Sequence, residues 1–140
     1  MPTLRPGRSR TAAVTAAVVL LAGAVTGCSS SDGPRETLEA FLAGWQAGNL
    51  DQVGFIAPDG ATFPAQQALT AIKGLSGQLA GTPPTVQAAD ADPRTAGDIA
   101  TMGITVRWAL PGAAAWSYPS EVRLAERGGG WRVIWEPAIV

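Results

Sequence analysis

Histidine is absent from this 140-residue chain, and cysteine occurs only once. Without histidine the chain cannot build a Ser-His-Asp triad, a Cys-His pair or an imidazole metal site. A single cysteine excludes an internal disulfide and a cysteine-based zinc cluster, so we expect no metal and no cofactor. A formal net charge of −1 provides no basic face for phosphate groups, so nucleic acid is not an expected partner. The length corresponds to one domain.

The first 27 residues differ in composition from the rest, because they contain no acidic residue. Three arginines (Arg5, Arg8 and Arg10) precede an uncharged run of 15 residues from Thr11 to Val25, which is mostly Ala, Val and Leu. That run is shorter than the roughly 20 residues that a membrane-spanning helix needs. It has the length of the apolar region of a signal peptide.

The end of this segment, Val25-Thr26-Gly27-Cys28, resembles the lipobox of bacterial lipoproteins. It predicts a signal peptide over residues 1–27, lipidation at Cys28 and a flexible tether over 28–33. Two or three lipid chains make a stable anchor, because each buried CH₂ contributes about 0.8 kcal/mol. The alternatives are a plain signal peptide followed by an unrelated cysteine, and a short uncleaved anchor.

The first half of the mature chain has helical patterns. Leu38, Phe41, Leu42 and Trp45 form one apolar stripe and predict a helix from Pro34 to Ala47, which Gly48-Asn49 ends. A short second helix is predicted over residues 50–56. A third is predicted over 63–79, where Leu69, Ile72, Leu75 and Leu79 have helical spacing.

From Thr85 onward the hydrophobic period changes to two, which is typical of strands. We predict strands over residues 85–91, 104–110, 116–127 and 131–136. Gly128-Gly129-Gly130 makes a hairpin turn between the last two. Helices followed by a run of strands indicate an α+β fold, in which N-terminal helices pack on a curved antiparallel sheet.

Two segments together carry a family resemblance. Phe41-Leu42-Ala43-Gly44-Trp45-Gln46-Ala47-Gly48-Asn49, followed by Leu50-Asp51-Gln52-Val53, resembles the opening of NTF2-like domains. The closing Trp131-Arg132-Val133-Ile134-Trp135-Glu136-Pro137 is more particular when it is combined with the lipobox. Residues 34–140 therefore resemble the NTF2-like N-terminal (MecA-type) domain of class B penicillin-binding transpeptidase lipoproteins, whose lipoprotein versions are typical of actinobacteria.

The resemblance implies a cone-shaped fold and a non-catalytic role at the extracytoplasmic face of the cell membrane. Such a domain positions or docks a C-terminal transpeptidase domain, which crosslinks peptidoglycan in the cell wall. The implied partners are the membrane, through the lipid anchor, and the transpeptidase domain or other cell-wall synthesis proteins.

The chain departs from this family in its chemistry. A transpeptidase carries Ser-x-x-Lys, Ser-x-Asn and Lys-Thr-Gly. The one lysine, Lys73, has Thr70 three residues before it and Gly74-Leu75 after it, so none of these motifs is present. We therefore expect no enzymatic activity from this chain, which ends at Val140 where family members normally continue. It is either a truncated gene product or a stand-alone small lipoprotein with an NTF2-like ligand-binding pocket.

A third interpretation is a pocket enzyme of isomerase type, which needs a carboxylate inside an apolar cone. The candidate groups are Asp51, Asp90, Asp92 and Asp98, with Tyr118 as a hydrogen-bond donor. Asp51 fits a helix cap, the other three aspartates lie in a loop-like segment, and Tyr118 fits the start of a strand. The solvated interpretations are therefore preferred.

The five tryptophans are numerous for a mature chain of 113 residues. Trp116 follows an uncharged loop and is the candidate for contact with a partner or sister domain. The other four lie on predicted apolar faces and are expected in the core: Trp45, Trp108, Trp131 and Trp135. A possible basic face comprises Arg107, Arg123, Arg127 and Arg132. Interleaved Glu121, Glu126 and Glu136 favour an ordinary solvated surface instead.

Overall fold

The computed structural model describes residues 32–79 and 82–139. The predicted signal peptide, Cys28 and most of the predicted tether lie outside these described residues. Within the described ranges, no helix is long and apolar enough to cross a membrane.

The first element, helix α1 (Pro34–Ala47), confirms the predicted helix residue for residue. Its four stripe residues are all buried: Leu38, Phe41, Leu42 and Trp45. Gly48 follows with φ of 69°, and its N–H bonds to the carbonyls of Gly44 and Trp45. Glycine enters this left-handed region without steric cost, which is why the helix ends there.

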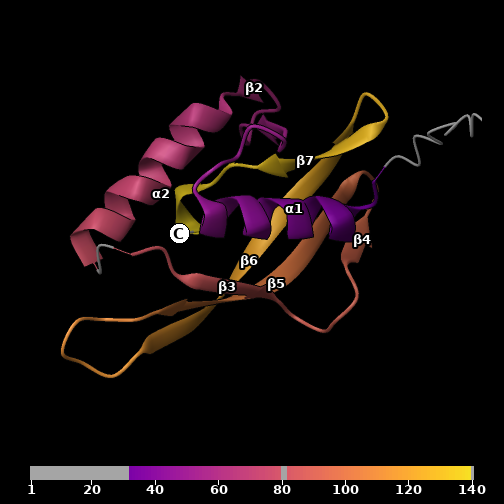
Figure 1. The fold of residues 1–140 in the computed structure, drawn as a ribbon. Coiled ribbons are helices and arrows are strands. Elements are labelled where there is room, and N and C mark those ends of the chain that lie inside the picture. The colour runs from indigo at the N-terminus through magenta and orange to yellow at the C-terminus, as the bar shows by residue number, and fades with distance from the viewer. Residues whose placement is uncertain (1–31, 80–81, 140) are drawn as a thin grey trace, which may run out of the picture.

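The sheet has seven strands in the order β2-β1-β7-β6-β5-β3, and β4 also pairs with β5 (Figure 1). All pairings are antiparallel except the short parallel one between β1 and β7. The strands are β1 (Phe55–Ile56), β2 (Thr62–Phe63), β3 (Thr85–Ala88), β4 (Arg94–Ala96), β5 (Ile99–Trp108), β6 (Trp116–Arg127) and β7 (Gly130–Ile134), and a 3₁₀ turn, η1 (Pro137–Ile139), follows β7.

The predicted helix over residues 50–56 is wrong. Residues 51–52 form a turn and Phe55–Ile56 form β1, which lies between β2 and β7. Phe55 belongs to the main core, whereas Ile56 belongs to a second apolar cluster with Ala125 and Ile134. Adjacent residues of a strand face opposite sides of a sheet, so burial on both sides produced an apolar run that resembled a helix.

Four other predicted elements have different bounds. The third predicted helix begins at Ala65 (α2, Ala65–Leu79) rather than at residue 63, because Thr62–Phe63 pair with β1 as β2. The strand predicted from residue 104 begins at Ile99, and the strand predicted over 85–91 ends at Ala88. The strand predicted over 131–136 spans Gly130–Ile134.

The core lies between the two helices and one face of the sheet, where α1 crosses β3, β6 and β7 (Figure 1). Phe41 in α1 meets Phe55 edge-on at 5.8 Å between ring centroids, and Phe55 meets Trp135 at 6.1 Å. Trp45, Trp108 and Trp135 are buried as expected, whereas Trp131 is half-buried and packs against the edge of this core. The predicted α+β architecture with helices on a sheet is confirmed.

Candidate functional site

The tip of the β5–β6 hairpin is an uncharged, exposed part of the described surface that carries the large apolar side chain of Trp116. No charged residue occurs from Trp108 to Ser120, and residues 111–117 are all exposed. In Figure 1 the two strands continue past the helices, so that the tip projects at the end of the molecule opposite the start of α1. We call residues 109–118 the hairpin tip. An uncharged, projecting loop is typical of a contact surface.

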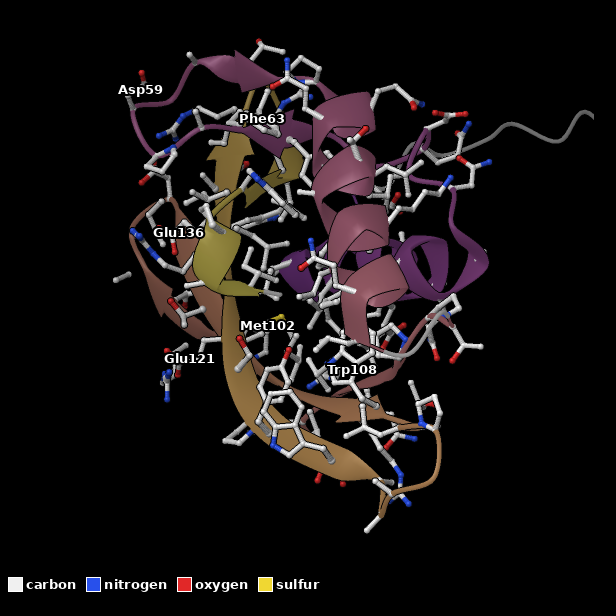
Figure 2. All side chains as sticks on the ribbon, turned by 90° about the vertical axis from the view of Figure 1, so that its left-hand side faces the viewer. Asp59, Phe63, Met102, Trp108, Glu121 and Glu136 are labelled. Carbon is white, nitrogen blue, oxygen red and sulfur yellow. The ribbon has the colours of Figure 1, made fainter. Side chains whose placement is uncertain are left out.

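Two paired tryptophans define where this surface begins. Trp108 and Trp116 are directly opposite each other in the β5–β6 ladder, so their side chains share one face of the sheet. Trp108 is only 1% exposed and lies near the C-terminal end of α2 (Figure 2), whereas Trp116 is 49% exposed. On this face of the sheet, the buried core therefore ends and the exposed surface begins between Trp108 and Trp116.

Tyr118 supports the Trp116 ring. Their ring centroids are 4.9 Å apart with an interplanar angle of 38°. Two residues further on, Ser120 Oγ donates hydrogen bonds to the carbonyls of Ala138 and Ile139 in η1, each at 3.4 Å. The C-terminal end of the domain thus lies against the same strand as the Trp116–Tyr118 pair.

None of the four candidate aspartates lies in the apolar core. All four are exposed, and among the described residues the only buried polar or charged one is Ser76. Asp51 accepts a hydrogen bond from Gln66 Nε2 at 2.9 Å, in the turn that replaces the predicted short helix. A proton shuttle needs its carboxylate inside the cone, so this arrangement does not suit isomerase chemistry.

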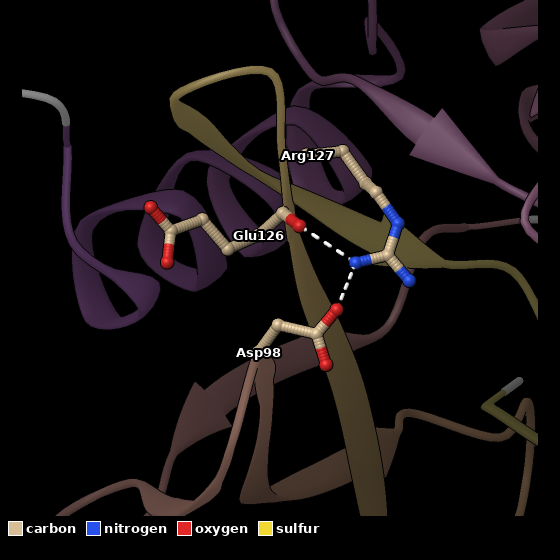
Figure 3. A network of polar contacts seen from close by, with 3 residues as sticks. All are labelled: Asp98, Glu126 and Arg127. Atoms are coloured by element: carbon tan, nitrogen blue, oxygen red, sulfur yellow. Dashed lines mark hydrogen bonds and ion pairs between the residues drawn. The ribbon is translucent and has the colours of Figure 1, made fainter.

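Asp98 has a structural partner instead. It occupies the turn between β4 and β5 and forms an ion pair with Arg127 Nη1, which also donates to the Glu126 carbonyl at 2.7 Å (Figure 3). The hydrogen bond from Arg127, together with its positive charge, holds the pKa of Asp98 below its ordinary value. Both side chains are about half exposed, so this pair adds little stability.

The four candidate arginines lie on the outer face of the sheet, away from the helices, by the register of β5, β6 and β7. Arg123 donates to Glu136 at 2.9 Å, and Arg94, which the basic-face hypothesis omitted, pairs with Glu121. Glu126 lies on the opposite face by the same register, and Asp98 supplies the third acidic partner. This outer face is therefore of mixed charge rather than a basic patch.

An apolar cavity of about 220 Å³ lies between the C-terminal half of α2 and the end of α1, and its lining includes Trp45, Leu69 and Ile72. Pockets for drug-sized ligands are about 300–1,000 Å³, so this one is small for a ligand site. Within residues 32–79 and 82–139 the buried Nε1 atoms of Trp45 and Trp108 lack a hydrogen-bond partner. No group of three or more potential metal ligands occurs in the same ranges.

One known protein family matches most of this chain. A family model described as an NTF2-like N-terminal transpeptidase domain matches residues 33–140. Among curated proteins, none matches this chain.

Solved structures with NTF2-like folds resemble this one. A protein designated "Rd1NTF2_04 with long sheet" aligns with a TM-score of 0.52 at 15% identity, covering 72% of this chain and 94% of that chain. An NTF2-like protein from Cytophaga hutchinsonii aligns at 0.45 and 17%, covering 74% and 94%. A hypothetical protein from Catenulispora acidiphila, with a ketosteroid isomerase-like fold and in complex with trimethylamine, aligns at 0.45 and 18%, covering 77% and 91%. The first of these alignments shows a shared fold.

Proposed function

Since the chain belongs to the family of NTF2-like N-terminal transpeptidase domains and is a domain of a transpeptidase-type protein, we propose that it positions the transpeptidase at the cell wall. In this proposal it is the non-catalytic, extracytoplasmic domain of a penicillin-binding lipoprotein. The observation that carries the proposal is the family match over residues 33–140, which includes every described helix and strand.

The hairpin tip is the proposed docking surface for the transpeptidase domain. An exposed tryptophan on a rigid strand is a suitable anchor, because aromatic residues dominate the centres of protein interfaces. Trp116 is held by Tyr118, and the C-terminal end of the domain lies beside the same strand at Ser120. A domain joined after Val140 would start beside β6, about four residues along the strand from Trp116.

The lipid anchor is proposed at Cys28. The described fold starts at residue 32, only four positions later, and leads into the start of α1. In Figure 1 the start of α1 and the hairpin tip lie at opposite ends of the molecule. A lipid at Cys28 would therefore hold the α1 end near the membrane and present Trp116 away from it.

The anchor is tested with Cys28→Ala in the full chain, expressed in a bacterial host. The unaltered protein should fractionate with membranes and incorporate a fatty-acid probe, and the variant should do neither. Labelling that persists in the variant would exclude lipidation at this residue.

Docking is tested with a photo-crosslinking amino acid at position 116 in cells that make the native protein. The matched control is position 117, which is exposed and adjacent but faces the opposite side of β6. Crosslinks from 116 should join a domain that also binds fluorescent penicillin, either in the same polypeptide or in a second one. Equal crosslinking from both positions would argue against this surface. Sequencing the DNA downstream of Val140 decides between the two arrangements, because a continuing frame would encode Ser-x-x-Lys, Ser-x-Asn and Lys-Thr-Gly.

A further inference from the structure

A second candidate surface is the edge of β3 that faces away from β5. β3 lies at one end of the sheet, and within residues 32–79 and 82–139 it pairs only with β5. Ala89 N–H donates to the Gly103 carbonyl at 2.9 Å, which sets the hydrogen-bonded positions of the ladder. Because these positions alternate in an antiparallel pair, the backbone groups of Val86 and Ala88 face away from β5. The edge thus offers unpaired hydrogen-bonding groups to an added strand.

A side chain partly occupies this edge. Gln46, in the last turn of α1, accepts a hydrogen bond from the Val86 N–H through Oε1 at 3.5 Å. Its Nε2 donates to the Leu42 carbonyl, also at 3.5 Å. Both distances are at the long limit for hydrogen bonds, so Gln46 is a weak and displaceable partner.

The space in front of this edge is an open groove of about 510 Å³ between α1 and β3. Leu42 and Val86 are buried at its base. Its lining includes Glu39, Leu42 and Gln46 from α1, Val86 and Ala88 from β3, and Asp90. The volume lies within the range of ligand pockets, and the shape is bounded by a helix on one side and a strand edge on the other.

The charged residues that line the groove are acidic. Glu39 and Asp90 are both exposed, and no basic residue is among the lining residues that the structure describes. Arg35 lies one turn before Glu39 on α1, where its guanidinium donates to the Ala91 carbonyl at 2.7 Å. The groove therefore presents carboxylates to whatever extends along β3.

We propose that the β3 edge binds an extended peptide segment with basic side chains, contributed by a partner protein. The peptide adds a strand to the sheet, its backbone bonds to Val86 and Ala88, and it displaces the Gln46 side chain. Its lysines or arginines meet Glu39 and Asp90. This binding function is separate from the docking of the hairpin tip and uses none of its residues.

The test measures fluorescence anisotropy of two labelled peptides with the full 140-residue protein. One probe is Thr-Val-Lys-Val-Lys-Thr and the other is Thr-Val-Glu-Val-Glu-Thr. We expect the lysine probe to bind about fivefold or more tightly, because each exposed charge pair adds only a small favourable contribution. Equal binding of the two probes would overturn the charge assignment.

Ala88→Pro is the decisive variant for the backbone. Proline removes the outward N–H and fills the approach of a neighbouring strand, yet proline is tolerated at sheet edges. We expect about tenfold weaker binding of the lysine probe. The matched control Ala88→Thr keeps the N–H and should bind within about twofold of the unaltered protein. Circular dichroism confirms that both variants fold, and equal affinities for them would refute strand addition.

Charge-neutralising variants test the charge preference, and amide hydrogen exchange locates the bound peptide. Glu39→Gln with Asp90→Asn should abolish the preference for the lysine probe, whereas Glu126→Gln, in β6 and outside the groove, should not. Amide hydrogen exchange should slow at Val86 and Ala88 when the lysine probe is added. Slowing at the hairpin tip instead would overturn this proposal while leaving the docking proposal intact. Slowing at Val86 and Ala88 that depends on protein concentration alone would assign the edge to a second copy of the chain.

Discussion

Gly44 lies in the segment that resembles NTF2-like domains, and the close packing after α1 is a physical reason for glycine at this position. A Cβ built on Gly44 would lie 2.5 Å from the Asn49 carbonyl oxygen and 2.9 Å from Leu50 Cδ2. The Asn49 backbone cannot easily retreat, because its N–H donates to the Gly44 carbonyl at 2.9 Å. The chain after α1 is therefore folded back so closely that only glycine fits at this position.

The change to test is Gly44→Ala. In a helix, alanine is favoured over glycine by about 1 kcal/mol, so propensity alone predicts a gain in stability. Overpacking costs about 1–3 kcal/mol, and here a backbone atom must move. We expect a net loss of up to about 2 kcal/mol in the free energy of unfolding.

The matched controls are Gly74→Ala and Gly77→Ala in α2. Apart from the chain neighbours and the backbone of α2 itself, no described atom lies within 4 Å of a Cβ at either position, so each change should stabilise the protein by about 0.5–1 kcal/mol. Urea unfolding followed by tryptophan fluorescence measures all three variants. If Gly44→Ala stabilised the protein as much as the controls, the close approach after α1 would be refuted.

Three further predictions follow from the contacts of single groups. Replacing Arg127 with Gln should raise the pKa of Asp98 toward its ordinary value, as measured by NMR titration of the carboxyl carbon. The ion pair lowers the pKa of Asp98 in the folded state. The contribution of the pair to stability is therefore present above about pH 4 and is lost as the pH falls through the folded-state pKa. A pKa of Asp98 that Arg127→Gln leaves unchanged would contradict the pairing. Trp108→Phe should cost less than Trp108→Ala in urea unfolding, because phenylalanine keeps part of the buried ring contacts and removes a donor that has no partner among the described residues. Trp108→Ala should cost about 3–5 kcal/mol, and equal losses for the two variants would contradict this expectation. Fluorescent penicillin should leave no covalent label on the 140-residue chain expressed by itself, as judged in a denaturing gel, and a labelled band would contradict the proposed non-catalytic role.

The sequence predicted elements well where one face of an element is buried. The stripe of α1 and the alternation of Val122 and Leu124 in β6 both reflect a single buried side, and both elements are present. β1 was missed because it is buried on both faces. β4 was missed for the opposite reason, since Arg94, Thr95 and Ala96 are all exposed and only pairing with β5 makes them a strand.

The two candidate surfaces also differ in how far the sequence could predict them. The exposure of Trp116 could be predicted, because the uncharged loop before it is visible in the sequence. The groove along β3 could not, because Glu39 and Asp90 are 51 positions apart and meet only when α1 packs along the edge strand. Edge status itself depends on strand order, which local periodicity does not encode.

The free edges of this sheet are protected to different degrees, and this difference separates the two proposals. β7 pairs with β6 only from Leu124 onward, so the first half of β6 has an open side, but Pro119 lacks an N–H there and η1 contacts Ser120. β2 has only two residues, which is too short to recruit a strand readily. β3 has four residues and no proline within it, and in the described part of the chain the one hydrogen bond on its outer edge is the long contact from Gln46 to Val86. Strand addition is therefore expected at β3, whereas the β6 side is suited to contact through the side chains of Trp116 and Tyr118.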